Sequence, residues 1–237
     1  MDLSNVKDEL FAHYPYRIEL HAHSRPVSKC SDVEPEELVD IYHKAGFDGL
    51  ALTNHFLAPL MERGGIELYL EDYDRAAAQA KKYGMKVYLA AELRFDENIN
   101  DYLLYGVDRK ILEQAAEYFD KGLSAFARDI KDKRSVLIQA HPYRKNIERI
   151  DVALLDGIEA WNLHSGHNSN PADSLHLAIK SGKSLRTAGT DYHHPSRQRP
   201  TVALRAKNLP EDSFALAALL KSGDFFFDME NESIILP

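Results

Sequence analysis

The amino-acid sequence predicts an α/β fold, in which strands and helices alternate at least six times along the chain. Short apolar runs such as residues 48–53 and 135–140 have the composition of strands that are covered on both faces. Between these runs lie longer stretches whose apolar residues recur at helical spacing. This alternation indicates a parallel sheet with helical crossovers, and at 237 residues a closed or nearly closed barrel is the natural form.

The individual elements follow from these patterns. Residues 16–20 are expected to form a short strand that ends at His21, and residues 35–45 a helix that begins at a proline and stops before Gly46. Further helices are expected at 67–83, 109–119, 123–133, 172–181 and 213–223. Further strands are expected at 48–53, 86–93, 101–107, 135–140, 157–163 and 184–189, with 224–228 and 232–236 as candidate strands near the end.

Composition limits the class of protein. Hydrophobic residues make up 44% and charged residues 28%, which is ordinary for a globular chain with a full core. No linker, low-complexity tract or internal repeat divides the sequence, so residues 1–237 are expected to form a single domain. The net charge of -8 makes tight binding to long nucleic acids or anionic membranes unfavourable, although it permits a local pocket for a small phosphate.

Other sequence features bear on location. The single Cys30 excludes an intrachain disulfide and favours a reducing, cytoplasmic environment. The first ten residues are polar and mixed in charge, so no signal peptide is expected. No run of 18 apolar residues occurs, so no membrane span is expected either, and no pattern indicates the oligomeric state.

Potential metal ligands follow six of the predicted strands. In a barrel the carboxyl ends of the strands converge on one rim, so residues far apart in sequence would face one cavity. Mixed imidazole and carboxylate ligands suit Zn, Mn or Fe, and their number indicates two or more ions. One strand-end histidine is more often structural than a ligand, but coincidence at six strands favours a metal site. The residues concerned are His21, His23, His55, Glu92, His141, His164, Asp191 and His193.

An ordered set of short motifs accompanies these residues. It comprises His21-Ala22-His23-Ser24, Ser31-Asp32 before Pro35-Glu36-Glu37-Leu38, Thr53-Asn54-His55, Ala91-Glu92, His141-Pro142 and Asp191-Tyr192-His193. Over about residues 17–199 the set resembles the PHP (polymerase and histidinol phosphatase) superfamily. The resemblance implies a distorted (βα)7 barrel similar to a TIM barrel, which hydrolyses phosphate esters with two or three divalent metal ions.

The resemblance also assigns residue roles. It implies that the catalytic set is Asp191, Glu92 and His55, and that the metal ligands are His21, His23, Asp32, His55, Glu92, His141, Asp191 and His193. Three departures from the family pattern stand out. The segment 25–30 lengthens the path from His23 to Asp32, Asn54 replaces an aspartate, and Tyr102 stands where many members have a histidine. His164 is therefore a candidate either for a ligand or for a substrate contact.

A phosphate substrate needs cationic side chains beyond the metal ions. Arg144 is the first candidate, because it lies just past a rim strand, and Arg197 and Arg199 follow. The implied activity is hydrolysis of a small phosphate monoester, of the nucleotide, sugar phosphate or histidinol phosphate type, by metal-activated water. Two alternatives stay open: a metal-dependent amidohydrolase, although no strand-end lysine fits its bridging role, and a non-catalytic metal-binding regulatory barrel.

Overall fold

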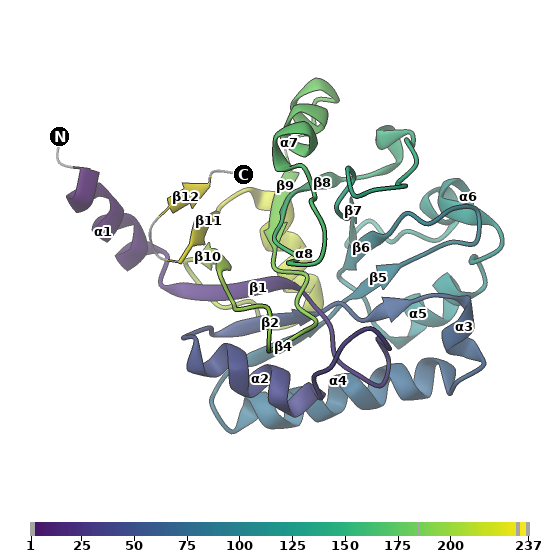
Figure 1. Ribbon diagram of the computed structural model, residues 1–237, viewed down its shortest axis with the longest axis horizontal. Helices are drawn as coiled ribbons and strands as arrows, with labels where there is room; N and C mark the ends of the chain where they lie inside the picture. The colour runs from purple at the N-terminus through teal and green to yellow at the C-terminus, as the bar shows by residue number, and fades with distance from the viewer. Residues whose placement is uncertain (1–2, 184, 231–232, 236–237) are drawn as a thin grey trace.

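The computed structural model describes residues 3–183, 185–230 and 233–235, and the strands within these ranges form two six-stranded sheets (Figure 1). The first sheet has the order β12 (Ser233–Ile235), β11 (Phe226–Met229), β10 (Val202–Ala206), β1 (Tyr16–Ala22), β2 (Gly49–Leu52) and β4 (Lys86–Leu89). The second has the order β3 (His55–Phe56), β5 (Ala91–Leu93), β6 (Tyr102–Tyr105), β7 (Val136–Gln139), β8 (Gly157–Asn162) and β9 (Leu185–Gly189).

The two sheets continue into one another along the chain. Only Thr53 and Asn54 separate β2 from β3, and only Ala90 separates β4 from β5. At the other edge, a parallel bridge pairs Ala22 at the end of β1 with Tyr192 beyond β9. The closed (βα)7 barrel expected from the sequence is not confirmed, because the hydrogen bonds between the named strands leave two sheets. The mixed α/β class is confirmed.

Strand direction differs from the predicted parallel sheet. β6 runs antiparallel to both of its neighbours, β5 and β7, while β7, β8 and β9 run parallel. The physical reason is the short connection from β5 to β6, residues 94–101, which holds no helix and so cannot make a crossover. β10 is also antiparallel to β1, and it extends the first sheet away from the parallel strands.

The helices cover the outer faces of the sheets. α2 (Pro35–Lys44) and α4 (Gly65–Lys81) lie side by side below β1, β2 and β4 in Figure 1. Helices α5 (Arg109–Ala116) and α6 (Gly122–Asp129) cover the second sheet, and α7 (Pro171–Lys180) packs on β8. Asp108 caps α5 by accepting a hydrogen bond from the backbone N–H of Ile111. The remaining helices are α1 (Leu3–His13), α3 (Ala58–Met61), the 3-10 helix Val152–Leu154 and α8 (Ser213–Ser222).

Side chains from both sheets share one apolar interior. Ile18 and Leu20 of β1 pack in the same cluster as Tyr105 of β6 and Ile138 of β7. The Tyr105 hydroxyl donates to the backbone oxygen of Leu20 at 2.9 Å, which ties the sheets together. The polar cluster described below lies where β1, β3, β5 and the loops after β7 and β9 meet. No helix in the described ranges has the length and apolar character of a membrane span.

Most predicted elements match the structure within a few residues. The six expected helices correspond to α2, α4, α5, α6, α7 and α8. The sequence patterns missed α1, β3, α3 and β10, and they joined β4 and β5 into one strand. The predicted strand boundaries at Ser184, Glu232 and Leu236 fall outside the described residues.

Candidate metal centre

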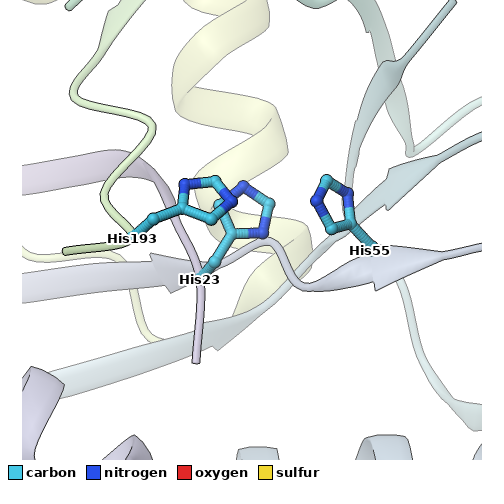
Figure 2. A group of neighbouring side chains, drawn as sticks. All are labelled: His23, His55 and His193. Atoms are coloured by element: carbon cyan, nitrogen blue, oxygen red, sulfur yellow. The ribbon is translucent and has the colours of Figure 1, made fainter. Parts of the chain in front are cut away.

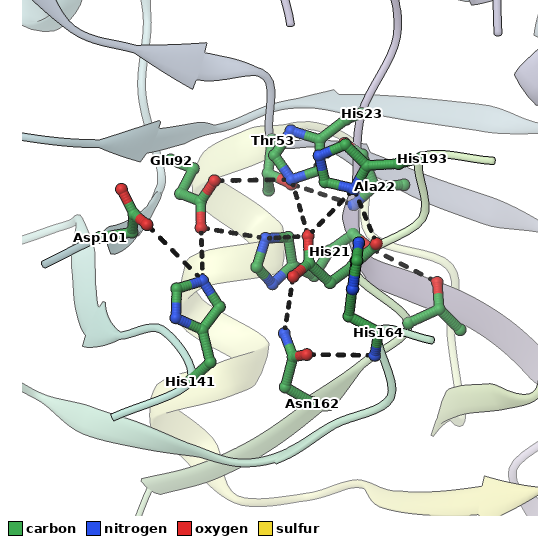
Figure 3. Close-up of polar contacts among 12 residues, drawn as sticks. His21, Ala22, His23, Thr53, Glu92, Asp101, His141, Asn162, His164 and His193 are labelled. Carbon is green, nitrogen blue, oxygen red and sulfur yellow. Dashed lines mark hydrogen bonds and ion pairs between the residues drawn. The ribbon is translucent and has the colours of Figure 1, made fainter. Parts of the chain in front are cut away.

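The His21 and His23 side chains, at the end of β1, form the middle of the cluster (Figure 3). The Nε2 atom of His21 lies 3.3 Å from a Glu92 oxygen and 3.4 Å from an Asp191 oxygen. The Nε2 atom of His23 lies 3.5 Å from Glu92 and 3.2 Å from Asp191. Because alternate residues of a strand point the same way, the two imidazoles face the same pair of carboxylates, as the spacing predicted.

His55 and His193 both lie next to His23, one to either side of it in the view of Figure 2. The His23 ring stacks on His193 with 4.2 Å between ring centroids, and His55 lies 4.6 Å away on its other flank. One nitrogen from each of the three rings lies within 4.8 Å of the other two. The Nδ1 atom of His55 also lies 2.7 Å from Glu92 Oε2, so that carboxylate contacts both parts of the cluster.

His141 and Asp101 extend the cluster on the opposite side. The Nε2 atom of His141 lies 3.1 Å from Glu92 Oε1 and 3.7 Å from Asp101 Oδ2 (Figure 3). Asp101 directly precedes β6, and it is fully buried. The sequence interpretation missed Asp101 as a site residue, because a parallel strand would have carried its first residue to the opposite rim. The antiparallel direction of β6 brings this residue to the cluster instead.

A second layer of polar groups orients the imidazoles. The Nδ1 atom of His21 lies 2.8 Å from Glu159 Oε1, and Glu159 Oε2 accepts a hydrogen bond from the backbone N–H of His141 at 2.9 Å. The Nδ1 atom of His23 lies 3.2 Å from the Ser28 hydroxyl. In both rings Nδ1 is engaged away from the cavity, and Nε2 is left for a ligand, as in carboxylate–histidine–metal arrangements.

The donor set fits divalent metal ions. Several buried atoms of the cluster make no hydrogen bond within the described residues: His21 Nε2, His23 Nε2, His55 Nδ1, Glu92 Oε2 and His141 Nδ1. Buried polar groups without partners are costly, and metal coordination is one way to satisfy them. The atoms group as His23, His55 and His193; as His21, His23 and Glu92; and as His55, Glu92 and Asp101. Imidazole and carboxylate ligands in such groups suit zinc, manganese or iron.

Charge balance in the cluster is consistent with such ions. Burial would lower the pKa of His21, but the carboxylates around it, Glu159 foremost, hold that pKa well above its ordinary value. In His23 burial prevails, and the pKa falls well below its ordinary value. Burial would raise the pKa of Asp191, but the facing His21 imidazole holds it well below the ordinary value. Buried carboxylates are thus ionised beside imidazoles, and a cation can take the place of the imidazole protons.

Backbone conformation at the cluster is unusual in two places. His141 has φ of 29° and Asp191 has φ of 49°, both in the left-handed region that residues with a Cβ rarely adopt. Such strain costs about 1–3 kcal/mol and is concentrated at functional sites. Just before Asp191, Gly189 approaches β1 so closely that an added Cβ would lie 2.5 Å from His21 Cβ. The geometry of the cluster therefore depends on this close backbone approach.

The cluster opens into a cavity of about 530 Å³ that contains cationic side chains. Arg144 lines it, as expected, and donates to Asp101 Oδ2 at 3.0 Å. Arg94, which the sequence interpretation missed, makes a bidentate pair with the same carboxylate at 2.7 and 2.9 Å. Arg63 and Lys29 line the cavity too. No motif or spacing in the sequence identifies Arg94 as a site residue, because it lies in the loop after β5.

His164 also lines the cavity. Its Nδ1 accepts a hydrogen bond from the backbone N–H of Gly166 at 2.8 Å, and its ring stacks on His167 with 4.5 Å between centroids. Burial, with His193 and His194 nearby, lowers the pKa of His164 to about 4, although Asp191 opposes this. An uncharged ring beside the cluster suits a substrate contact.

Three predicted site residues lie elsewhere. The carboxylate of Asp32 is 65% exposed and pairs with His194 Nδ1 at 2.7 Å, because the segment 25–30 changes the path of the chain after His23. Arg199 is 84% exposed and pairs with Glu230 at 3.7 Å. Arg197 is exposed and does not line the cavity. Both arginines lie on the loop between β9 and β10, on either side of the buried Gln198.

Asn54 occupies the position of the family aspartate, and its side-chain carbonyl accepts two hydrogen bonds. The donors are the Ser24 backbone N–H at 2.7 Å and the Ser28 hydroxyl at 2.9 Å, whereas the His55 ring is not one of them. The Asn54 amide donates to Asp72 Oδ2 at 3.1 Å. An aspartate at position 54 would place two carboxylates against each other, which explains the amide.

The fold and the cluster define this chain as an α/β protein with a group of potential metal ligands. A family model for the PHP domain matches residues 19–182, and the chain therefore belongs to the PHP domain family. This confirms the resemblance found in the sequence. No curated protein matches the chain.

Solved structures share the fold at low sequence identity. A protein of Bifidobacterium adolescentis, provisionally assigned as a metal-dependent phosphoesterase, is 16% identical with a TM-score of 0.54, covering 86% of this chain and 95% of that one. A two-domain protein of Bacteroides vulgatus contains a domain assigned by prediction as a PHP-like metal-dependent phosphoesterase. It is 15% identical with a TM-score of 0.62, and the match covers 90% of this chain and 64% of that one. An amidohydrolase of Chromobacterium violaceum with bound sulfate and no metal is 15% identical with a TM-score of 0.47, covering 82% and 92%.

Proposed function

We propose that this protein hydrolyses small phosphate monoesters at a centre of two or three divalent metal ions. The observation that carries the proposal is the convergence of unpartnered imidazole and carboxylate atoms at the floor of an arginine-lined cavity. The residues that would hold the ions are His21, His23, His55, Glu92, Asp101, His141, Asp191 and His193. Divalent ions bound by them would activate water and neutralise charge on the phosphoryl oxygens.

Glu92 and Asp191 have the central role among these residues. Glu92 Oε1 lies within 3.3 Å of His21 and His141, and Oε2 lies within 3.5 Å of His23 and His55, so its two oxygens can serve neighbouring ligand groups. Asp191 lies between His21 and His23 from the opposite face. His55 adds a nitrogen to the groups on either side of Glu92. We therefore keep Asp191, Glu92 and His55 as the catalytic set.

The cavity sets the size and charge of the substrate. Its volume of about 530 Å³ is of the size that binds one small molecule such as a nucleotide or sugar phosphate, which supports a small substrate. Arg144 and Arg94 lie on the Asp101 side of the cluster, and Arg63 lies across the cavity, where its guanidinium donates to the backbone oxygens of Pro26 and Val27. Guanidinium groups bind phosphate oxygens through paired hydrogen bonds, so these side chains would orient the phosphoryl group.

The test combines metal analysis with a screen of substrates. Protein purified without chelator is expected to contain two to three equivalents of Zn, Mn or Fe, measured by elemental mass spectrometry. It is expected to release inorganic phosphate from members of a panel of nucleotides, sugar phosphates and histidinol phosphate. Less than one metal per chain together with no turnover after reconstitution would contradict the proposal. Turnover of amides in place of phosphate esters would indicate the amidohydrolase alternative.

A pair of variants makes the test specific. Asp191→Ala removes a buried carboxylate of the cluster, and it is expected to reduce both metal content and phosphate release, the latter by at least about 100-fold. Asp120→Ala changes an exposed aspartate far along the chain, after α5, and it is expected to alter neither. Full metal content without turnover in the unmodified protein would favour the regulatory barrel.

A further inference from the structure

Cys30 lies at the edge of the metal cluster, in the segment 25–30 that lengthens the path from His23. Its Sγ atom is 3.2 Å from His55 Nε2, and His193 is a further neighbour of the thiol. It lines the same cavity as these two histidines. For comparison, a thiolate and an imidazole that bind one tetrahedral zinc ion lie about 3.5 Å apart. The observed separation is close to that value.

Two serines fix the position of this thiol. Ser28 is buried, and its hydroxyl accepts from the backbone N–H of His55 at 2.9 Å and lies 3.2 Å from His23 Nδ1. Ser31 is buried too, and its hydroxyl donates to the backbone oxygens of His23 and His193 at 3.1 and 3.2 Å. Ser28 thus ties the segment that carries Cys30 to His55 and His23, and Ser31 ties it to His23 and His193.

The ligand group nearest Cys30 consists of three imidazoles, and the carboxylates that reach its edge, Glu92 and Asp191, also face His21. One nitrogen each of His23, His55 and His193 lies within 4.8 Å of the other two, and the buried Nε2 of His23 has no hydrogen-bond partner among the described residues (Figure 2). Three nitrogens leave one position of a tetrahedral site to fill. The carboxylate that the family resemblance assigns to this region, Asp32, pairs with His194 outside the cluster.

We propose that the Cys30 thiolate is a metal ligand, which completes a site of three histidines and one cysteine with His23, His55 and His193. The inference rests on the metal centre proposed above and names its chemistry more closely. Thiolates are soft ligands, so this site selects Zn²⁺, Co²⁺ or Fe²⁺ over Mn²⁺ and Mg²⁺. The extra residues after His23 then serve to exchange a carboxylate ligand for a thiolate.

Cobalt spectroscopy tests the proposal directly. Metal-free protein is titrated with Co²⁺ under anaerobic conditions, and the near-ultraviolet absorption is recorded. Because the chain has one cysteine, a thiolate-to-cobalt charge-transfer band can come only from Cys30. The expected result is such a band, with a final intensity that corresponds to one thiolate-bound Co²⁺ ion per chain. Cobalt bound without this band overturns the proposal, and so does a failure to bind cobalt.

Variants provide the matched control. Cys30→Ser is expected to lose the band and to weaken Zn²⁺ binding by at least about tenfold, whereas Asp32→Asn is expected to keep both. Loss of the band in Asp32→Asn with Cys30 intact contradicts the assignment. A measurement on the unmodified protein does not depend on how the variants fold: bound Zn²⁺ is expected to slow alkylation of Cys30 at least tenfold, and unchanged alkylation contradicts the assignment.

These readouts separate this inference from the proposed activity. A charge-transfer band in a protein that hydrolyses no phosphate ester leaves the thiolate ligand in place and removes the phosphoesterase. If cobalt supports phosphate release but gives no charge-transfer band, the phosphoesterase proposal stands and the thiolate ligand is contradicted. Absence of bound metal under all conditions contradicts both.

Discussion

The buried carboxylate of Glu159 determines which nitrogen of His21 faces the cavity. One of its oxygens lies 2.8 Å from His21 Nδ1, and the other accepts from the His141 backbone N–H and from the Asn162 amide at 2.9 and 3.0 Å. Glu159 therefore links the segments that carry His21 and His141, although it is not itself one of the proposed metal ligands. It is a positioning residue, and the second layer around a metal site commonly contributes in this way.

Glu159→Gln is expected to weaken Zn²⁺ binding by about 10- to 100-fold, because the amide is a poorer partner for the His21 N–H than the carboxylate. The amide oxygen can still accept from the His141 backbone, so the metal-free protein is expected to unfold at nearly the same temperature. Competition with a chelator of known affinity measures the binding. Glu117→Gln, at an exposed position, is the control. Equal Zn²⁺ affinity in the two variants would contradict a positioning role for Glu159.

Asp72 makes the stability of the protein depend on pH. Its side chain is buried beside α2, where Ser24 and Asn54 donate to Oδ2 at 3.0 and 3.1 Å. Burial raises the pKa of Asp72 to about 6, since it outweighs the hydrogen bonds from Ser24 and Val27 and the Arg75 charge, and the carboxylate of Glu34 adds to it. A carboxyl with a raised pKa holds its proton more tightly in the folded chain than in the unfolded one.

The sign of the effect follows. Between about pH 4 and pH 6 the Asp72 carboxyl keeps its proton in the folded state but loses it in the unfolded state. The free energy of unfolding therefore falls by up to about 3 kcal/mol as pH rises through this range, and above it the contribution of Asp72 no longer changes with pH. Urea unfolding of the metal-free protein and of Asp72→Asn across this range measures the effect. Titration of the site histidines is common to both and cancels in the difference. A difference that stays constant with pH would contradict the raised pKa.

The sequence could predict the residues that belong to strand ends and to ordered motifs. His21, His23, Glu92 and Asp191 are brought together as expected, because their positions depend on the strand pattern alone. Asp101 could not be found without the direction of its strand. Other residues were misplaced or missed because they lie on irregular loops, where no periodicity fixes the direction of a side chain: Asp32, Arg94, Arg197 and Arg199.

At the level of elements, β1 and the end of β9 approach each other unusually closely. Gly189 lies against the His21 backbone, where an added Cβ would be 2.5 Å from His21 Cβ and 3.3 Å from its backbone nitrogen. Neither neighbour is the flexible end of a side chain, so neither can move away cheaply. The bridge from Ala22 to Tyr192 depends on the same approach.

Gly189→Ala is therefore expected to separate these two elements. The free energy of unfolding should fall by about 1–3 kcal/mol through overpacking, and metal content should fall with it because His21 and Asp191 move apart. Gly223→Ala is the matched control, since that glycine has φ of 69° and open space around it, far from the cluster. The control should lose about 1 kcal/mol through backbone strain and keep its metal. Full metal content in Gly189→Ala would contradict the role of the close approach.

Element type was predictable from local patterns, but element direction was not. A short continuous apolar run marks residues 101–107 as a strand, and this run is the same whichever way the strand runs. The length of the preceding loop carries the direction, because a loop without a helix cannot return the chain to the same end of the sheet. β10 was missed because no helix separates residues 202–206 from β9, so the alternation of strand and helix is interrupted there.

For the molecule as a whole, the cluster joins parts of the chain that the strand pairing leaves in separate sheets. His21 and His23 belong to the end of the first sheet, whereas His55 and Glu92 belong to the second. The proposed ligands span residues 21–193, so few of their contacts are local in sequence. An ion that binds only the folded chain stabilises it in proportion to the logarithm of the free ion concentration.

Removal of metal is accordingly expected to lower the unfolding temperature. At a free Zn²⁺ concentration about 1,000 times the dissociation constant the stabilisation is about 4 kcal/mol, which for a chain of this size corresponds to roughly 10 °C. Thermal unfolding with Zn²⁺ and with chelator measures the shift. Asp191→Ala is expected to lose most of it, because the ion then lacks the carboxylate between His21 and His23, and Asp120→Ala is expected to keep it. An equal shift in both variants would mean that zinc stabilises the protein from some other site, and that the cluster does not hold the two sheets together.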